Sequence, residues 1–241
     1  MLILAFESSA KPASVAVLDV CDASGSSHEH KLLGQYFQNN GFSHSRTLLS
    51  MAESLLKSLD IKPADIGLVA VAKGPGSFTG VRIGVSAAKG FAWGLDIPVC
   101  GVSTLKAMAR QTRLFDTVIC PVMDARRNQV YNALFRWHGD KPERSCDDRA
   151  ISIDELASEL KLHNEPFMLV GDGTDVCKKN ISDRNLIATP EILHYQTAYG
   201  VALAALHTEP IPSETLEPFY LRPSQAERER NNIKDSRQSL F

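Results

Sequence analysis

An order of apolar segments that occurs twice along the chain constrains the fold more than any other feature. The first half begins with two strand-like runs that predict a β-hairpin, followed by a third strand and then by helices that alternate with strands. The second half begins again with a strand that ends at a carboxylate, Asp124, as the first strand ends at Glu7. We expect strands at 2–6, 14–19, 33–37, 66–72, 99–102, 118–123, 129–137 and 167–171, and helices at 43–59, 80–95, 104–113, 153–160 and 197–206. This repeated order predicts an α/β protein of two related lobes.

The length of the chain agrees with two small lobes. It has 241 residues, of which 44% are hydrophobic. A domain contains about 150 residues in many proteins. We assign an N-terminal lobe with the candidate partner-binding helices to residues 1–106 and a smaller C-terminal lobe to 107–222. The charged segment 223–241 is predicted to be a disordered polar tail.

The charge balance limits the function classes that are open to the chain. Lysine and arginine total 26, aspartate and glutamate total 28, and the net charge is −2. A strongly basic nucleic-acid-binding protein is excluded, so contact with RNA would come from a local patch or through a partner. The apolar run at 2–6 has no basic residue before it, and no later run approaches a membrane span. We therefore expect a cytoplasmic protein with no membrane contact.

The most informative loop lies between a predicted buried strand and a predicted helix, and reads KGPGSFTGVR at residues 73–82. Backbone N–H groups and the helix dipole can hold an anion at such a place. The loop fits neither phosphate-binding template, because no Gly-Lys-Ser/Thr follows and the third glycine of a dinucleotide motif would fall at Thr79. Spacing alone favours a tight turn that needs glycine over an anion-binding loop.

The helix after this loop is apolar over most of its circumference, which predicts burial on more than one side. One of its faces carries small or apolar residues, namely Ile83, Ala87, Gly90 and Gly94. Short side chains let another helix approach closely. Two interpretations stay open: this helix and the one at 43–59 pack only on each other, or together they present a surface to a partner.

Several segments together resemble one known family. The long motif KGPGSFTGVRIG at 73–84 continues to PVCGVSTL at 98–105. It is supported by LILAFESS at 2–9, His44, MDAR at 123–126, and EPFYLR at 217–222. On these segments the chain closely resembles the bacterial TsaB proteins, also called YeaZ.

The resemblance implies a duplicated two-lobed fold of the actin-like ATPase (ribonuclease H-like) type, with a reduced second lobe. It implies a role in forming threonylcarbamoyladenosine next to the anticodon of tRNA. In that system TsaD is the transferase, TsaB is its non-catalytic heterodimer partner, and TsaE is an ATPase that joins them. The resemblance further implies homodimers when TsaB is alone, tRNA contact only through the complex, and no cofactor of its own, since ATP is used by the assembled complex.

The resemblance also suggests two sets of site residues. The candidate partner-binding residues lie on the two helices and are His44, Leu48, Met51, Leu55, Arg82, Ile83, Ala87, Gly90 and Gly94. A possible weak nucleotide-binding set comprises Glu7, Gly74, Gly76, Ser77 and Asp124. Most relatives have aspartate in place of Glu7, whose longer side chain weakens a role in positioning a magnesium-bound phosphate.

The residues themselves argue against catalysis by this chain. TsaD-type proteins carry a metal-binding His-x-x-x-His where this sequence has Thr104 and Met108, which do not replace imidazole as metal ligands. We therefore expect no metal site.

Three alternatives stay open. A self-sufficient ATPase or kinase of the same fold would use Glu7 and Asp124. A peptidase is suggested by GVSAA at 84–88, but Ser86 lies inside a predicted helix rather than at a nucleophile elbow. Direct tRNA binding would use Arg82, Arg126 and Arg127, and would be weak and salt-sensitive.

Overall fold

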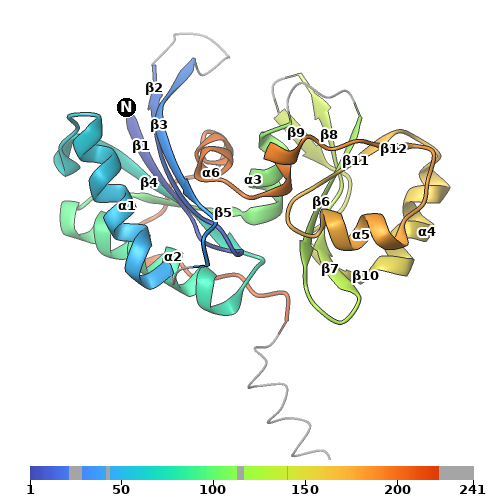
Figure 1. Ribbon diagram of the computed structural model, residues 1–241. Coiled ribbons are helices and arrows are strands. Elements are labelled where there is room, and N and C mark those ends of the chain that lie inside the picture. The colour runs from blue at the N-terminus through green and yellow to red at the C-terminus, as the bar shows by residue number, and fades with distance from the viewer. Residues whose placement is uncertain (22–28, 42–43, 113–116, 140, 223–241) are drawn as a thin grey trace, which may run out of the picture.

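The computed structural model describes residues 1–21, 29–41, 44–112, 117–139 and 141–222. Within these ranges the chain folds into two lobes, each built around a β-sheet (Figure 1). The predicted helix cap Ser43 and the predicted tail at 223–241 lie outside the described residues. The α/β class and the two-lobed arrangement are confirmed.

The sheet of the first lobe has five strands in the described residues, in the order β3-β2-β1-β4-β5. β1 runs antiparallel to β2 and parallel to β4, so the predicted hairpin lies beside the predicted buried strand. The strands are β1 (Leu2–Glu7), β2 (Ala13–Val20), β3 (His30–Gln38), β4 (Ile66–Gly74) and β5 (Val99–Ser103). Central strands covered on both faces are expected to read as continuous apolar runs, as β1 and β4 do.

The second sheet repeats this topology with shorter strands. Its path is β10-β7-β6-β11-β12, with β6 antiparallel to β7 and parallel to β11, as β1 is to β2 and β4. The strands are β6 (Val118–Asp124), β7 (Gln129–Asn132), β8 (Phe135–His138), β9 (Lys141–Arg144), β10 (Arg149–Ser152), β11 (Phe167–Val170) and β12 (Leu186–Ile187). The duplication predicted from the order of segments is therefore a duplication of strand topology.

The single strand predicted at 129–137 is wrong, because this segment forms two strands. β7 pairs with the end of β6 and with β10, whereas β8 pairs with β6 near its start, through Phe135 and Ile119. Between the two strands the N–H of Leu134 donates to Cys146 Sγ at 3.3 Å, outside the ladder. An apolar run does not show where a strand changes its partner.

The helices form three layers around the two sheets. The outer face of the first sheet is covered by α1 and α2, the outer face of the second by α4 and α5, and the space between the sheets is filled by α3 and α6 (Figure 1). The bounds are α1 (His44–Ser58), α2 (Phe78–Leu95), α3 (Thr104–Arg110), α4 (Ile153–His163), α5 (Thr174–Asn180) and α6 (Ala198–Ala205). Short 3-10 turns lie at Pro63–Asp65, Glu191–His194 and Ser213–Thr215.

The position of α6 crosses the division made on the sequence. The range 107–222 assigns this helix to the C-terminal lobe, but α6 packs on β1, β2 and β4 of the first sheet. Ala198, Val201 and Ala202 share a core with Ile3 and Ala5. The chain thus returns to the first lobe after the second is complete, so a contiguous range does not describe the first lobe.

Two helix ends differ from the prediction because of capping. α2 begins at Phe78 rather than at residue 80, since Ser77 Oγ accepts the N–H of Gly80 at 3.3 Å. α3 ends at Arg110, and its predicted end at Arg113 lies outside the described residues. Ser103 caps α3, since its Oγ accepts the N–H of Lys106.

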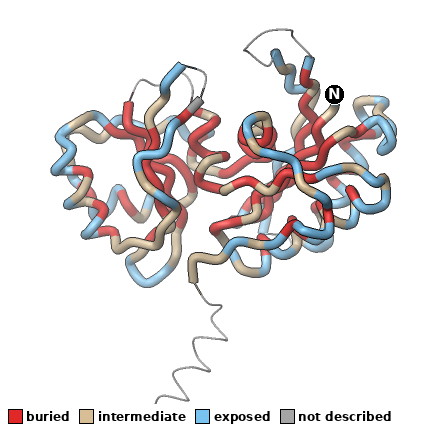
Figure 2. Tube along the Cα trace, turned by 180° about the vertical axis from the view of Figure 1, so that it is seen from behind, coloured by how far each residue is buried: buried red, intermediate tan, exposed pale blue. Residues whose placement is uncertain are grey.

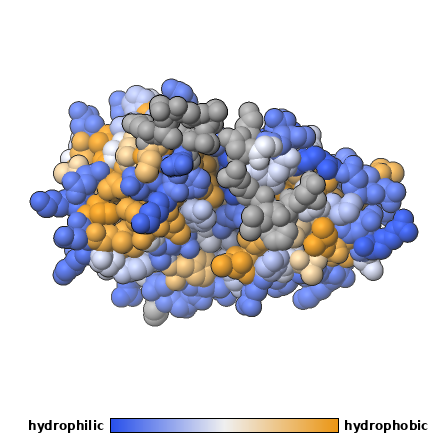
Figure 3. All heavy atoms as spheres, turned by 90° about the horizontal axis from the view of Figure 1, so that it is seen from above, coloured by the Kyte–Doolittle hydropathy of each residue, from blue (hydrophilic) through white to orange (hydrophobic). Residues whose placement is uncertain are grey.

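Buried residues follow the strands of both lobes, while the outer sides of the covering helices are exposed (Figure 2). From above, apolar residues gather over the first lobe, and the second lobe is mainly hydrophilic (Figure 3). Among the described residues, no helix combines the length and apolar character needed to cross a membrane.

Candidate partner-binding groove and inter-lobe cleft

A groove of about 540 Å³ lies between α1 and α2 on the outside of the first lobe. We call it the α1–α2 groove. Apolar side chains and short polar ones line it together with one cation, Arg82. Its lining residues are His44, Ser45, Leu48, Leu49, Phe78, Thr79, Arg82, Ile83, Ser86 and Ala87. The structure thus brings five of the predicted partner-binding residues together at one surface feature.

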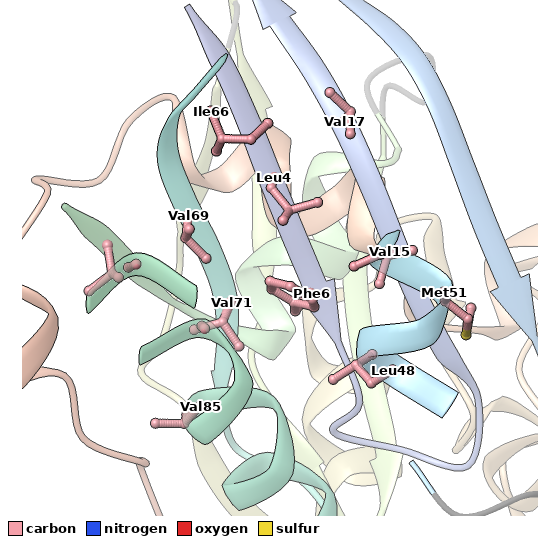
Figure 4. Close-up of a cluster of buried hydrophobic side chains, with 14 of the residues drawn as sticks. Leu4, Phe6, Val15, Val17, Leu48, Met51, Ile66, Val69, Val71 and Val85 are labelled. Atoms are coloured by element: carbon pink, nitrogen blue, oxygen red, sulfur yellow. The ribbon is translucent and has the colours of Figure 1, made fainter. Parts of the chain in front are cut away.

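Three residues predicted to bind a partner belong to the core. Leu48, Met51 and Leu55 are almost fully buried, and they pack with Phe6 and Val15 of the first sheet (Figure 4). The wide apolar arc of α1 arises because the helix packs against both β2 and β3. These three side chains hold α1 on the sheet, and Leu48 also forms part of the groove floor. Contact between them and a partner stays a prediction.

The outer side of α2 carries the open part of the predicted surface. Ile83 and Ala87 are half-buried, and a Cβ added at Gly90 or Gly94 would meet no atom within 4 Å. These four residues thus share an accessible face, on which a helix could approach the backbone closely.

Two exposed apolar residues at this surface were missed in the sequence. Trp93 is 79% exposed and lies three residues beyond Gly90 on α2, while Leu49 of α1 is 53% exposed and lines the groove. Neither residue belongs to the predicted partner-binding set. Each could have been recognised in the sequence as a large apolar residue at the border between the apolar and the polar face of its helix.

Two polar residues of the groove are held by other parts of the chain. His44 Nε2 donates to the carbonyl of Ala10 at 2.8 Å, which fixes the first turn of α1 to the loop after β1. The guanidinium of Arg82 lies 3.9 Å from the centre of the Phe78 ring, and its Nε donates to Tyr220 Oη at 2.8 Å. Arg82 thus contacts the C-terminal segment as well as the groove.

A second, larger cavity of about 760 Å³ opens between the lobes. We call it the inter-lobe cleft. It is lined from the first lobe by the loop before α2, from the second by the end of β6 and Asp172, and from the C-terminal segment by residues 220–222. Gly76, Ser77 and Asp124 of the predicted nucleotide-binding set line it, whereas Glu7 and Gly74 are not among its lining residues.

Two backbone donors in and after the loop before α2 bond within the protein. Ser77 N–H donates to the carbonyl of Ser9 at 2.6 Å, and Gly80 N–H donates to Ser77 Oγ. A Cβ at Gly76 would lie 2.4 Å from the same Ser9 oxygen, so only glycine fits there. These contacts favour the tight-turn interpretation of the loop over an anion-binding one.

Glu7 is buried at the end of β1. Burial raises its pKa to about 7, and the nearby Asp172 adds to the rise, while the hydrogen bond from Ser9 N–H to Glu7 Oε1 at 2.6 Å opposes it. Its second oxygen, Oε2, has no hydrogen-bond partner among the described residues. In the free chain this carboxyl is therefore half-protonated near neutrality.

The acids of the second lobe are partly neutralised from within. Asp124 accepts the N–H of Arg126 at 2.8 Å and forms an ion pair with the same residue at 3.3 Å. Burial raises the pKa of Asp172 to about 6, although Gln196 donates to this carboxylate at 2.7 Å. The cleft therefore combines carboxyl groups with Lys11, Arg126 and Arg222 along its wall.

The positions that correspond to the metal ligands of TsaD-type proteins are buried in α3. Thr104 and Met108 are almost fully buried, and Met108 packs with Leu105 and Ile119. Within the described residues, no group of three or more His, Cys, Asp or Glu side chains could hold a metal ion.

Ser86, the residue that suggested a peptidase, lies inside α2 on the wall of the groove. The histidine of that groove, His44, bonds the Ala10 carbonyl. The strand-to-helix elbow that activates a serine nucleophile is not present at Ser86.

Comparison with known proteins identifies the family of the chain. Residues 39–228 match a family model described as TsaD, tRNA N6-adenosine threonylcarbamoyltransferase. The tRNA threonylcarbamoyladenosine biosynthesis protein TsaB of Bacillus subtilis is 34% identical over 94% of this chain and 96% of its own length. The protein of the same name from Haemophilus influenzae is 30% identical over 74% of this chain and 80% of its own.

Two solved structures share the fold. YeaZ from Pseudomonas aeruginosa aligns with a TM-score of 0.71 at 21% identity, over 91% of this chain and 99% of its own. A structure described as similar to peptidase YEAZ, from the same organism, aligns with a TM-score of 0.73 at 23% identity, over 92% and 99%. The chain belongs to the TsaB family of tRNA threonylcarbamoyladenosine biosynthesis proteins, within the wider family that the TsaD model describes.

Proposed function

We propose that this chain is a non-catalytic partner of TsaD in forming threonylcarbamoyladenosine on tRNA, and that TsaD binds at the α1–α2 groove. The observation that carries the proposal is the open outer face of α2, where Ile83, Ala87, Gly90 and Gly94 stand beside the exposed Trp93 and Leu49. Exposed apolar residues gathered on one side of a protein mark interaction surfaces, and buried aromatic side chains contribute most to binding.

Homology between the two proteins explains why TsaD would fit this face. Because a TsaD family model matches more than half of the chain, TsaD is expected to carry helices equivalent to α1 and α2. Two related faces can then pack about a pseudo-twofold axis as four helices. When TsaD is absent, a second copy of this chain would occupy the same face and form a homodimer.

The remaining parts of the proposal concern the reaction. TsaD would supply the metal and the transfer chemistry, TsaE would join the complex as its ATPase, and tRNA would be held by the assembly. ATP would be used by the complex, and nucleotide binding by the inter-lobe cleft of the free chain would be weak. Weak nucleotide binding is supported by the hydrogen bonds that backbone donors in and after the loop before α2 make within the protein.

The test is reconstituted tRNA modification with TsaD, TsaE and variants of this chain. Ile83→Arg and Ala87→Arg each place a long cation in the packed face, so TsaD affinity should fall about thirtyfold or more, and modification with it. Leu162→Arg is the matched control, because Leu162 is an 85% exposed apolar residue on α4 of the other lobe. Each variant's melting curve shows that it remains folded. Wild-type TsaD binding by both groove variants would overturn the proposal.

The competing function, a self-sufficient ATPase or kinase, rests on Asp124 and Asp172 in the inter-lobe cleft. Calorimetric titration of the isolated chain with ATP separates the two functions. Low-micromolar affinity together with turnover would favour the enzyme, and millimolar or weaker binding without turnover favours the partner role.

A further inference from the structure

The last described segment of the chain ties the two lobes together. It leaves the core at Leu216, which is 1% exposed, and Lys89 Nζ of α2 donates to the carbonyls of Glu214 and Leu216 at 3.0 and 3.1 Å. It then runs along the foot of the first lobe towards the second (Figure 1). We call residues 217–222 the strap.

The middle of the strap lies directly on the loop before α2. Phe219 N–H donates to the carbonyl of Lys73 at 2.6 Å. Gly74 has φ +120°, and a Cβ there would lie 2.1 Å from the carbonyl oxygen of Phe219. Glycine at this position is therefore explained by the backbone of the strap, 145 residues further along the chain, rather than by a phosphate.

Tyr220, the next residue of the strap, contacts the wall of the α1–α2 groove. The rings of Tyr220 and Phe78 stack with centres 4.7 Å apart, and Tyr220 Oη accepts from Arg82 Nε. Phe78 and Arg82 both line the groove, while Tyr220 lines the inter-lobe cleft. Phe78 lines the cleft as well as the groove, so these three side chains lie where the two cavities adjoin.

The end of the strap contacts the second lobe. Arg222 donates to Gln129 Oε1 and, at 3.4 Å, to the carbonyl of Ala125. The turn between these residues contains three consecutive residues with positive φ: Arg126, Arg127 and Asn128. Such a backbone persists only where its surroundings hold it in place. The hydrogen bonds from Arg222 of the strap to Ala125 and Gln129 help to keep this turn of the second lobe in place.

We propose that the strap couples the outer face of α2 to the β6–β7 turn at residues 125–128, so that occupation of the α1–α2 groove changes the wall of the inter-lobe cleft. A partner that moves Arg82 or Phe78 would displace Tyr220, because Tyr220 contacts both residues. Arg222 follows two residues later and bonds the turn, so the displacement would reach the turn. The link between the groove and the turn is inferred from contacts within the free chain. Its use by TsaD rests on the proposed function.

The first experiment tests the link in the free, full-length chain by hydrogen exchange followed by mass spectrometry. The amides of Ala125, Arg126 and Gln129 report on the turn, because each donates a hydrogen bond within it. In Tyr220→Ala and in Arg222→Ala, exchange at 125–129 should rise about fivefold. Arg127→Ala, an exposed arginine of the same turn, is the matched control and should leave the amides of the strap unchanged.

Tyr220→Phe separates coupling from loss of packing. It keeps the ring against Phe78 and removes only the hydroxyl that Arg82 bonds, so exchange in the turn should rise by a smaller factor than in Tyr220→Ala. Wild-type exchange at 125–129 in Tyr220→Ala would overturn the link, whether or not any partner binds.

The second experiment adds TsaD. With the wild-type chain, exchange should slow at 78–87 in the groove and change at 125–129. With Arg222→Ala, protection at 78–87 should persist and the response of the turn should be lost. An unchanged response of the turn in Arg222→Ala would overturn the coupling. Absence of protection at 78–87 in the wild type would instead overturn the proposed binding site, while the first experiment still decides the link.

Discussion

The two faces of α2 contain the same kind of residue and have opposite surroundings. On the inner face, a Cβ at Gly80 would lie 2.1 Å from the carbonyl oxygen of Ser8, and one at Gly84 would lie 2.5 Å from Ser8 Oγ. On the outer face, Gly90 and Gly94 have nothing within 4 Å of that position. Inner glycines let the helix approach the strand end closely, whereas outer glycines leave room that none of the described residues fills.

The neighbouring helix α1 shows the same contrast with leucines. Leu48 and Leu55 are buried in the core, while Leu49, next to Leu48, is more than half exposed. Whether a glycine or a leucine of these helices belongs to the core or to the surface therefore depends on what packs against it. The inner face builds the lobe, and the outer face is available to a partner.

The largest effect should separate core leucine from surface leucine. Leu55→Ala removes a side chain that packs on Gly34 of β3, and should lower the free energy of unfolding by about 2–5 kcal/mol. Leu49→Ala should change it by less than about 0.5 kcal/mol and weaken TsaD binding. Urea denaturation and a binding titration of both variants check this. Equal losses of stability in the two variants would contradict the assignment of Leu55 to the core and Leu49 to the surface.

The buried carboxyl group of Glu7 predicts that the free energy of unfolding depends on pH. Glu7 has a pKa of about 7 in the folded chain and near 4.5 when unfolded, so the folded state binds more protons between these values. Stability should therefore fall as pH rises through this window, by about 3 kcal/mol in all. Asp172, with its pKa raised to about 6, adds a loss of the same sign.

The matched variant for this prediction is Glu7→Gln, which keeps an oxygen for the N–H of Ser9 and does not ionise. Urea denaturation at pH 5 and pH 8 should show most of the fall in the wild type and a much smaller one in Glu7→Gln. An equal slope in both proteins would assign the pH dependence to other groups.

The inner glycines should be sensitive to a single methyl group. In Gly80→Ala the new Cβ meets backbone, which cannot rotate away, so we expect a loss of about 1–3 kcal/mol. The melting temperature measures it. A stability equal to the wild type would show that the first turn of α2 can shift away from Ser8.

The smallest effect should have the opposite sign. Gly90→Ala removes backbone freedom at an exposed helical position and should stabilise the free chain by about 0.5–1 kcal/mol. If a partner helix packs closely there, the same methyl group should weaken TsaD binding. Increased stability together with unchanged affinity would show that this part of α2 lies outside the interface.

Most of the fold could be predicted because its signals are local. The apolar runs of β1 and β4 and the spacing in α1 and α2 place these elements within a few residues of their bounds. The break between β7 and β8 could not be predicted, because it depends on which part of β6 each segment pairs with. The return of α6 to the first lobe depends on contacts with residues at the start of the chain.

The candidate site could be predicted only in part. The sequence identified α1, α2 and the loop before α2 as the unusual region, and five of the predicted partner-binding residues line one groove. It also included Met51 and Leu55, which the structure buries in the core, and did not include the exposed Trp93 and Leu49. Periodicity tells that residues share a face, but not whether a sheet or solvent lies against that face.

By itself, the sequence determined the element types, the duplicated order and the family resemblance, since all three are written in local patterns and in their succession. Only the tertiary structure decided which glycines of α2 are open, which leucines of α1 are core, and what Gly74 accommodates. The physical reason is distance along the chain. Ser8 lies 72 residues from Gly80 and Tyr220 lies 138 residues from Arg82, and neither contact leaves a trace in the residues around it.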